Sequence, residues 1–223
     1  MRVAVLIPCL DEAAALPAVL GELPPGFEVV LCDNGSTDGS PDVARRLGAR
    51  VSHEPVPGYG GALLAGIALL RADPPDVVVV LDGDHSVYAE DLPSLLAPIE
   101  RGEADLVIGD RTALAEPGSL TPPQRAGNWL ATRLIALRTG RRFRDLGPLR
   151  ALTWAALERL GMEDRTWGWN VEMQLKAVRR GLRVVEVPVR YRPRIGQSKI
   201  SGTVKGVLRA GGKILWATAR YSR

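Results

Sequence analysis

The run Val77-Val78-Val79-Val80-Leu81, followed at once by Asp82-Gly83-Asp84, decides the fold of this chain. A short run of mostly β-branched residues after Pro74-Pro75 is typical of a parallel strand buried on both faces. Two carboxylates one residue apart follow its carboxyl end, where open α/β sheets bind ligands. Carboxylate oxygens suit Mg²⁺ or Mn²⁺, which commonly complete their shell with phosphate oxygens. A polar turn after a core strand uses the same residue types, so the pair needs support from the rest of the chain.

Composition indicates a single globular domain. The chain has 223 residues, of which 46% are hydrophobic and 24% charged, and this excludes a disordered protein. Cys9 and Cys32 follow the pattern of reduced core thiols in a cytoplasmic protein. The chain begins directly with a predicted strand, so we expect no signal peptide. No segment approaches the roughly 20 apolar residues of a membrane-spanning helix.

Charge is distributed unevenly. Nine Lys and Arg residues and no acidic residue follow Glu186, whereas the whole chain has a formal net charge of +4, so the part up to Glu186 carries −5. A basic end of this kind predicts binding to phosphate or to an anionic membrane surface.

Predicted strands and helices alternate through the first half, which favours a doubly wound, mostly parallel α/β sheet with helices on both faces. The strands are expected at Arg2–Pro8, Glu28–Asn34, Arg50–Glu54, Asp76–Asp84 and Asp105–Arg111. The helices between them are expected at Ala13–Leu23, Pro41–Leu47, Gly61–Arg71 and Asp91–Arg101. The second half predicts helices at Pro123–Thr139 and Leu152–Leu160 and from about Asn170, a strand at Arg183–Arg192, and a last helix from about Ser201.

Polar and glycine-rich motifs follow the first three strands. They are Pro8-Cys9-Leu10-Asp11-Glu12, Asp33-Asn34-Gly35-Ser36-Thr37-Asp38 and Gly58-Tyr59-Gly60-Gly61-Ala62. The glycines of the third motif would let backbone N–H groups approach a diphosphate at a helix N-terminus. No G-x-G-x-x-G follows the first strand and no Gly-Lys-Ser/Thr occurs, which argues against a dehydrogenase and a P-loop NTPase.

Together with Asp82-Gly83-Asp84, these motifs resemble glycosyltransferase family 2, whose members have the GT-A fold. The resemblance continues through Val107-Ile108-Gly109-Asp110-Arg111 and ends in Arg194-Ile195-Gly196-Gln197-Ser198-Lys199. This last pattern is similar to that of the dolichyl- or polyprenyl-phosphate mannose and glucose synthases. The resemblance to the family covers nearly the whole chain. It implies a GT-A catalytic domain over residues 1–200, followed by a basic amphipathic helix over 201–223.

The resemblance implies roles for individual residues. Pro8, Glu12 and Asp33 would hold the base and ribose of a UDP- or GDP-sugar donor, with Gly60 at its diphosphate. Asp82 and Asp84 would bind Mg²⁺ or Mn²⁺ with the diphosphate, Asp82 also lying near the ribose. The residues facing the diphosphate or an acceptor phosphate would be Arg111, Arg125, Arg194, Ser198 and Lys199. An Arg fork bridges phosphate oxygens in pairs, and Lys supplies a point charge.

Two departures from the family pattern stand out. Many lipid-phosphate synthases carry a metal-binding Gln two residues beyond the second Asp, where this chain has Ser86, and His85 before it is either a ligand or a solvated loop residue. The chain also shows no C-terminal transmembrane helices of the kind that many relatives carry.

The middle of the chain supplies the acceptor-side candidates. Asp145-Leu146-Gly147-Pro148-Leu149-Arg150 is similar to a D-x-x-G-F-R-A stretch of the family, so Asp145 would position the transferred sugar or the nucleophile. Trp167 and Trp169 are either packing residues or a platform for sugar or lipid, and Glu172 either orients its neighbours or reacts. A phosphate acceptor is already ionised and needs no strong base, whereas a hydroxyl acceptor would need Asp145 or Glu172 as the catalytic base.

The last predicted helix has apolar residues at helical spacing, including Ile214, Leu215 and Thr218, and a basic row of Lys205, Arg209 and Lys213. This pattern fits an interfacial membrane helix, and it equally fits a helix packed on the domain. We therefore expect a cytoplasmic enzyme, peripheral at the membrane face, that binds no nucleic acid.

The combined prediction is a metal-dependent inverting glycosyltransferase with a polyprenyl-phosphate-type acceptor. A soluble or glycan hydroxyl acceptor is the main alternative. A sugar-phosphate nucleotidyltransferase is a second, although the glycine- and arginine-rich loop expected after Arg2–Pro8 is absent. A non-catalytic nucleotide-sugar-binding protein is a third, against which Asp82 and Asp84 argue.

Overall fold

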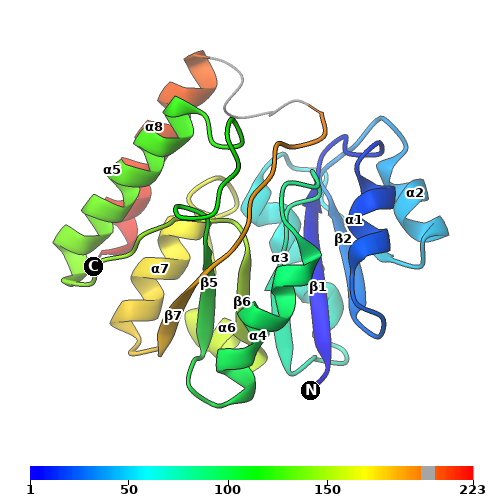
Figure 1. Ribbon diagram of the computed structural model, residues 1–223, viewed down its shortest axis with the longest axis horizontal. Coiled ribbons are helices and arrows are strands. Elements are labelled where there is room, and N and C mark those ends of the chain that lie inside the picture. The colour runs from blue at the N-terminus through cyan, green and yellow to red at the C-terminus, as the bar shows by residue number, and fades with distance from the viewer. Residues whose placement is uncertain (197–203, 223) are drawn as a thin grey trace.

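The computed structural model describes residues 1–196 and 204–222, with side chains over 1–196 and 211–222. Seven strands form one sheet in the order β3-β2-β1-β4-β6-β5-β7 (Figure 1). The strands are β1 (Val3–Cys9), β2 (Glu28–Asp33), β3 (Arg50–His53), β4 (Val77–Val80), β5 (Leu106–Asp110), β6 (Arg150–Thr153) and β7 (Val184–Pro188). The helices are α1 (Leu16–Glu22), α2 (Ser40–Arg46), α3 (Tyr59–Leu70), α4 (Leu92–Glu100), α5 (Pro122–Thr139), α6 (Trp154–Leu160), α7 (Trp169–Arg179) and α8 (Val204–Tyr221), with a short 3₁₀ turn at Ala89–Asp91.

The sheet is mostly parallel, as the sequence predicts. Only β6 is antiparallel to its neighbours β4 and β5. The strand order reverses between β1 and β4, which pair in parallel. In doubly wound sheets the crevice outside the carboxyl ends of the strands at such a reversal is where ligands bind. The fold therefore places Pro8 at the end of β1 beside Asp82 and Asp84 after β4.

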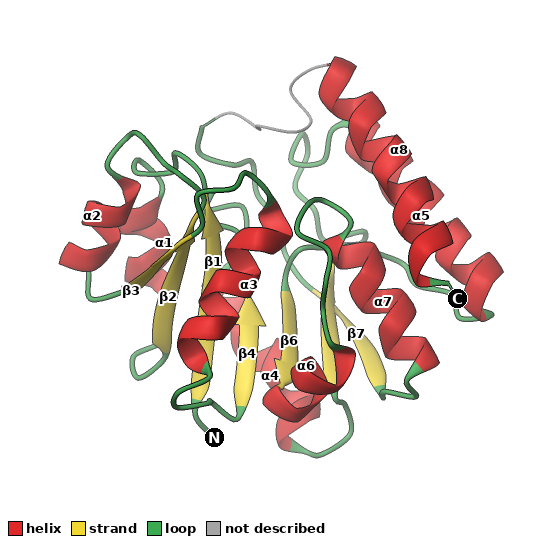
Figure 2. Cartoon of the chain, turned by 180° about the vertical axis from the view of Figure 1, so that it is seen from behind, coloured by secondary structure: helices red, strands yellow, loops and turns green. Residues whose placement is uncertain are grey.

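The helices cover both faces of the sheet. One face packs against α1, α2 and α4, and the other against α3, α6 and α7 (Figure 2). Successive β4 residues alternate between the two cores: Val77 and Val79 belong to the first, and Val78 and Val80 to the second. All four are buried, which explains the uninterrupted apolar run in the sequence.

Helices α5 and α8 form an outer layer, in which both helices pack on each other and on α7 (Figure 1). Over the part of α8 whose side chains are described, residues 211–221, the buried face consists of Ile214, Ala217, Thr218 and Tyr221. Leu215, predicted on the apolar face, is instead 53% exposed. Thus α8 packs on the domain, while the side chains of Lys205 and Arg209 lie outside the described residues.

The main difference from the expected elements is β6. The sequence predicted a helix over Leu152–Leu160, whereas Arg150–Thr153 is a strand and α6 begins at Trp154. Thr153 ends the strand and caps the helix, because its Oγ1 accepts a hydrogen bond from the Ala156 N–H at 3.1 Å. A four-residue buried strand is too short for its alternation to be distinguished from a helical turn. The strands β4 and β7 are also shorter than predicted.

Cys9 and Cys32 are free and buried, as expected, and burial raises the pKa of Cys9 to about 11.

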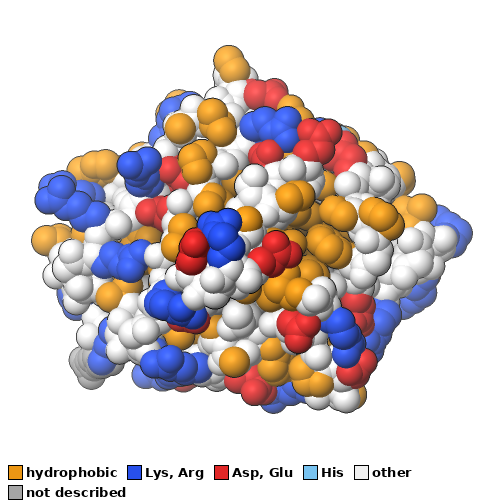
Figure 3. All heavy atoms as spheres, turned by 60° about the horizontal axis from the view of Figure 1, so that its bottom comes forward, with side chains coloured by type: hydrophobic (Ala, Val, Ile, Leu, Met, Phe, Trp, Pro, Cys, Tyr) orange, Lys and Arg blue, Asp and Glu red, His pale blue; other side chains and the backbone are white. Residues whose placement is uncertain are grey.

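Within the described residues, none of the helices has the length and apolar character needed to cross a membrane. The end of the molecule at the bottom of Figure 1, opposite the carboxyl ends of the central strands, carries charges of both signs with apolar atoms between them (Figure 3).

Candidate active site

A cleft of about 800 Å³ opens at the carboxyl ends of β1 and β4. Asp82, Asp84 and Arg194 line it together with Pro8 and Glu12, so the structure brings five predicted site residues into one cavity. Part of the opposite wall comes from Trp167 and from Lys213 and Trp216 of α8. The volume lies within the range of sites for nucleotide-sized ligands.

Asp82 and Asp84 differ in their surroundings. Oδ1 of Asp84 accepts hydrogen bonds from the Ser86 N–H at 3.0 Å and the Ser86 hydroxyl at 2.5 Å. Asp82 has the Tyr59 hydroxyl 3.5 Å from its Oδ1. Burial, and then the negative charge of Asp84, raise the pKa of Asp82 to about 7. The residue at the family's Gln position, Ser86, thus fixes one oxygen of Asp84.

Arg194 bridges the two sides of the cleft. Its Nη2 donates to Oε1 of Glu12 at 2.8 Å, and its Nη1 lies 3.2 Å from Oδ2 of Asp84. The Ile195 N–H also donates to the Asp84 carbonyl at 2.9 Å, which ties this segment to the loop after β4. Nε of Arg194 is buried without a hydrogen-bond partner, so the guanidinium has a spare donor.

The carboxylates fit a hard divalent cation. A cation between them would relieve the repulsion that raises the pKa of Asp82. Among the described residues, no cluster of three His, Cys, Asp or Glu side chains has the arrangement of a metal site. A Mg²⁺ or Mn²⁺ ion held here would therefore take most of its ligands from phosphate and water, as these ions commonly do.

Glu12 and Asn34 line the cleft on the side of β1 and β2. Oδ1 of Asn34 accepts from the Gly58 N–H at 2.6 Å, and its amide donates to the Glu54 and Val56 carbonyls. Asp33 is buried, and its carboxylate accepts from the Ser36 N–H at 3.0 Å and contacts Nδ1 of His53 at 2.8 Å. Asp33 thus holds the loop after β2, and its contact with a base stays a prediction.

The glycine motif has a different role from the one predicted. The N–H groups of Gly60 and Gly61 donate to the carbonyls of Thr166 and Arg165, at 3.3 and 2.8 Å. These donors are therefore committed to the loop 164–168 and do not face a diphosphate. A Cβ at Gly60 would lie 1.9 Å from the Asp164 carbonyl oxygen, so glycine is needed here for close backbone packing.

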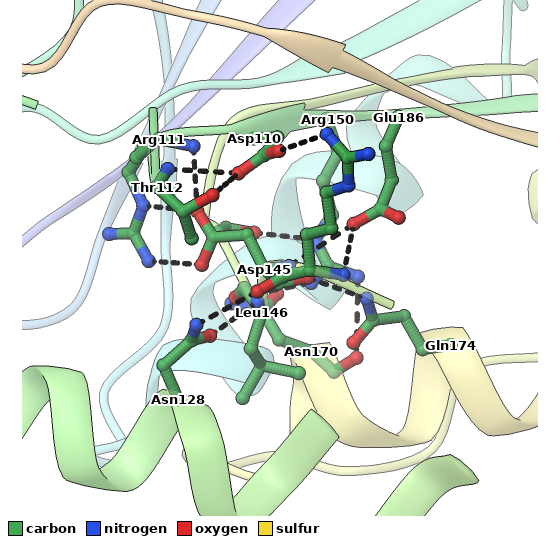
Figure 4. Close-up of polar contacts among 12 residues, drawn as sticks. Asp110, Arg111, Thr112, Asn128, Asp145, Leu146, Arg150, Asn170, Gln174 and Glu186 are labelled. Carbon is green, nitrogen blue, oxygen red and sulfur yellow. Dashed lines mark hydrogen bonds and ion pairs between the residues drawn. The ribbon is translucent and has the colours of Figure 1, made fainter. Parts of the chain in front are cut away.

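Asp145 and Arg111 form a buried, two-pronged ion pair (Figure 4). Nε of Arg111 donates to Oδ2 at 2.7 Å and Nη2 to Oδ1 at 2.8 Å, and the Arg111 N–H adds a third bond at 2.9 Å. Burial alone would raise the pKa of Asp145, but the bonds from Arg111 lower it below its ordinary value. These contacts favour a positioning role for Asp145 over the predicted role of catalytic base.

Arg150 holds the loop 144–149 that carries Asp145. It is fully buried, and its guanidinium donates to the carbonyls of Gly147, Leu146 and Asn170 at 2.9 to 3.3 Å. Burial lowers its pKa to about 10. Gln174 of α7 donates to the Asp145 carbonyl at 2.9 Å, so α7 fixes the loop from below (Figure 4).

Glu172 is also buried, and all its contacts are structural. Its oxygens accept from the N–H groups of Glu163 and Asp164 at 2.8 and 2.7 Å, and Lys176 lies 2.6 Å away. This geometry favours the reading in which Glu172 orients its neighbours and argues against the predicted catalytic base. Trp169 is 1% exposed and belongs to the core, whereas Trp167 is 37% exposed and lines the cleft.

Two further residues considered from the sequence, Arg125 and His85, lie outside the cleft lining. Arg125 is exposed on α5, and its Nε donates to the Leu120 carbonyl at 3.3 Å, away from the cleft lining. His85 pairs with Glu22, its Nε2 lying 2.8 Å from Oε1. Ser198 and Lys199 are outside the described residues.

Sequence reasoning missed several residues that shape the site. Tyr59 belongs to the motif over residues 58–62, which was interpreted through its glycines alone. Asp164 lies in no recognisable motif. Lys213 was predicted only as part of the basic row on the last helix, and nothing local in the sequence indicates that Lys213 and Trp216 of this helix reach the cleft.

Residues 4–156 match the model of the glycosyl transferase family 2. The chain belongs to this family. The protein is therefore a glycosyltransferase, as the motifs predicted. The match ends within α6, so α7, β7 and α8 lie beyond it.

Curated relatives extend the similarity over nearly the whole chain. An uncharacterised glycosyltransferase of Mycobacterium tuberculosis is 43% identical over 207 residues, which is 92% of each chain. A dolichyl-phosphate hexose transferase of Haloferax volcanii is 35% identical, with 88% of this chain and 86% of the relative covered. An undecaprenyl-phosphate mannosyltransferase of Micrococcus luteus is 33% identical, with 92% and 90% covered.

Solved structures confirm the GT-A fold. Glucosyl-3-phosphoglycerate synthase from Mycobacterium tuberculosis, in complex with Mn²⁺, UDP-glucose and phosphoglyceric acid, matches with a TM-score of 0.79. It is 23% identical, and the match covers 99% of this chain and 79% of that one. The same enzyme in complex with Mg²⁺ and UDP matches with a TM-score of 0.77 at 22% identity, with the same coverage.

Proposed function

We propose that this protein is a metal-dependent inverting glycosyltransferase that moves a sugar from a nucleotide-diphosphate donor to a polyprenyl-phosphate-type acceptor. The observation that carries the donor half is the cleft at the β1/β4 reversal, in which Asp82, Asp84 and Arg194 meet. The solved enzyme of the same fold, crystallised with Mn²⁺ and UDP-glucose, supports a metal–nucleotide donor.

The donor would bind with its diphosphate between Asp84 and Arg194. Asp82 and Asp84 would hold Mg²⁺ or Mn²⁺, and the bound ion would neutralise the leaving diphosphate. Arg194 would add positive charge to the same group through its two-pronged guanidinium. Ser86 keeps Asp84 oriented, since its N–H and hydroxyl both bond to Oδ1 and leave Oδ2 toward the cleft side that Arg194 occupies.

The proposal of a phosphate acceptor rests on the hydrogen bonds that the two candidate bases, Asp145 and Glu172, already accept. Asp145 is bound on both oxygens by Arg111, and Glu172 is bound on both oxygens by backbone N–H groups. A hydroxyl acceptor needs a carboxylate that can take its proton, whereas a phosphate acceptor is already ionised near neutral pH. The occupied carboxylates therefore favour a phosphate acceptor, in line with the relatives named for dolichyl and undecaprenyl phosphate.

The reaction would be a single in-line displacement at the anomeric carbon. An acceptor phosphate oxygen attacks from the face opposite the diphosphate, the bond to the nucleoside diphosphate breaks, and the sugar configuration inverts. Arg111, fixed by Asp145 and stacked 4.9 Å over the Tyr191 ring, contributes positive charge near Asp82.

The outer layer of α5 and α8 supports peripheral association with a membrane face. Trp129 and Leu137 on α5 are 63% and 79% exposed, and Leu215 on α8 is 53% exposed. Arg125 and Arg138 are also exposed on α5. Exposed apolar side chains beside basic ones are typical of a surface that lies against anionic lipid.

The experiment is a transfer assay with purified protein, Mn²⁺ or Mg²⁺, UDP- and GDP-sugars and undecaprenyl phosphate in detergent. We expect a glycosyl-phosphoprenol product, detected by mass spectrometry, that is lost when the metal is chelated. A product formed only on a soluble hydroxyl acceptor would overturn the acceptor assignment.

A further inference from the structure

The cleft has a wall that the family model does not cover. Lys213 and Trp216 of α8 line the same cavity as Asp82 and Asp84, although they follow the matched region by more than fifty residues. Trp167, from the loop before α7, lines it as well. None of these side chains has a role in the donor site described above.

Lys213 is held in place by a buried carboxylate. Its Nζ lies 2.7 Å from Oδ2 of Asp164, whose side chain is fully buried. Oδ1 of Asp164 accepts from the N–H groups of Thr166 and Gly168 at 2.7 and 3.3 Å. A Cβ at Gly168 would lie 2.4 Å from Oδ2 of Asp164 and 2.9 Å from Cε of Lys213, so glycine makes room for the pair.

The same ammonium lies over an aromatic ring. Nζ of Lys213 is 3.6 Å from the ring centroid of Trp216, a cation–π contact. Trp216 is 48% exposed and Trp167 is 37% exposed, so both indoles present apolar surface in the cleft. An ammonium has three N–H donors, and the ion pair with the single oxygen Oδ2 of Asp164 does not engage all of them, which leaves donors for an anion.

We propose that Lys213, Trp216 and Trp167 form the acceptor subsite of the cleft, with Lys213 binding the acceptor phosphate and the two indoles contacting the first isoprene units. A cation beside exposed aromatic surface matches an anionic group joined to an apolar chain. This inference rests on the proposed function, because it names the residues that would take its acceptor. It also gives α8 a part in substrate binding besides packing on α5 and α7.

The test uses farnesyl phosphate as a short acceptor and compares Trp216→Ala with Leu47→Ala. Leu47 is a matched control, because it is an apolar residue that is 49% exposed, close to the 48% of Trp216, and it belongs neither to the cleft lining nor to the layer of α5 and α8. We expect Trp216→Ala to raise the acceptor KM about tenfold, which corresponds to about 1.4 kcal/mol, with the donor KM unchanged. Leu47→Ala is expected to leave both constants near the parent values.

Lys213 is tested by Lys213→Met and Lys213→Arg, after circular dichroism confirms that both fold. Lys213→Met is expected to raise the acceptor KM at least as much as Trp216→Ala, and Lys213→Arg to restore most of the loss. A purely structural role would instead change donor and acceptor constants together and lower the unfolding temperature in parallel.

The outcomes separate this inference from the proposed function. If the parent protein transfers sugar to no prenyl phosphate, the proposed acceptor class is wrong. If it does so and the Trp216→Ala and Leu47→Ala variants behave alike, only the subsite is wrong. An equal rise of the donor KM in Trp216→Ala would assign the indole to the donor and overturn the subsite.

Discussion

Arg194 lies with its Nη1 3.2 Å from Oδ2 of Asp84 and is at the same time hydrogen-bonded to Glu12. A cationic side chain therefore already faces one of the two carboxylates proposed to bind the metal. Because the segment from Arg192 to Ile195 is also tied by backbone bonds to Ser86 and Asp84, the guanidinium is held in the cleft proposed as the donor site.

Replacing Arg194 by Ala is expected to lower kcat by roughly 10²-fold, since it removes a donor to the charge that develops on the leaving diphosphate. Arg194→Lys should recover part of this loss, because it keeps the charge without the fork. Steady-state kinetics with Arg190→Ala as control provide the measurement, since Arg190 pairs with Glu90 and Asp91 and lines no part of the cleft. Equal effects of the two alanine variants would contradict a donor-site role.

Replacing Asp145 by Asn is expected to destabilise the protein by about 3 kcal/mol at pH 7, since it leaves the buried Arg111 charge without its partner. The bonds from Arg111 lower the pKa of Asp145, so its contribution to stability is present above the usual Asp pKa and is lost as pH falls through the lowered value. The difference in the free energy of unfolding between the parent and Asp145→Asn, measured by urea titration, should therefore become smaller below about pH 4.

The matched control is Glu103→Gln, which breaks the exposed pair with Arg101 and should leave the free energy of unfolding close to that of the parent. If the difference in the free energy of unfolding between the parent and Asp145→Asn stays constant from pH 7 to pH 3, the ion pair is not the source of that difference.

Gly60→Ala is expected to destabilise the fold by about 2 kcal/mol or more and to weaken donor binding, because the new Cβ would meet the Asp164 carbonyl oxygen at 1.9 Å. Gly127→Ala, on α5 with nothing within 4 Å of its Cβ, should be neutral or stabilising by up to about 1 kcal/mol. Thermal unfolding of the two variants gives the comparison. A Gly60→Ala protein as stable as the parent would disprove the tight packing of this turn against the loop 164–168.

Glu172→Gln is expected to lower stability by about 3 kcal/mol, because Glu172 pairs with Lys176 in the core. Turnover of the folded fraction should keep the pH profile of the parent protein. If the variant folds but loses the acidic limb of its pH–rate profile, Glu172 is a catalytic base after all.

Much of the cleft proposed as the donor site could be predicted from the sequence. Asp82 and Asp84 follow a strand of four consecutive valines, which predicts that the strand is buried. The alternation of strands and helices then predicts that the end of this strand lies beside Pro8. Glu12 and Arg194 were found only through the family resemblance, because 182 positions separate these two partners.

The parts that could not be predicted depend on packing between distant segments. The glycines at 60 and 61 looked like a diphosphate cradle, yet their N–H groups serve the loop 164–168. Nothing in the sequence near Asp145 indicates that Arg111 binds its carboxylate. Nothing near Glu172 indicates that its carboxylate accepts hydrogen bonds from the N–H groups of residues 163 and 164. Lys213 reaches the cleft only because α8 packs across α5 and α7, a tertiary contact that helical periodicity does not encode.

Calorimetric titration of UDP, with and without Mn²⁺, on the parent protein and on Asp84→Ala most directly tests the claim that Asp82 and Asp84 hold a metal–diphosphate. We expect Mn²⁺ to strengthen UDP binding to the parent by at least about tenfold and to have no effect on binding to the variant. Asp42→Ala, which removes an exposed carboxylate on α2, serves as control and should behave as the parent does. Binding to Asp84→Ala that is strengthened by Mn²⁺ as much as in the parent would contradict the claim.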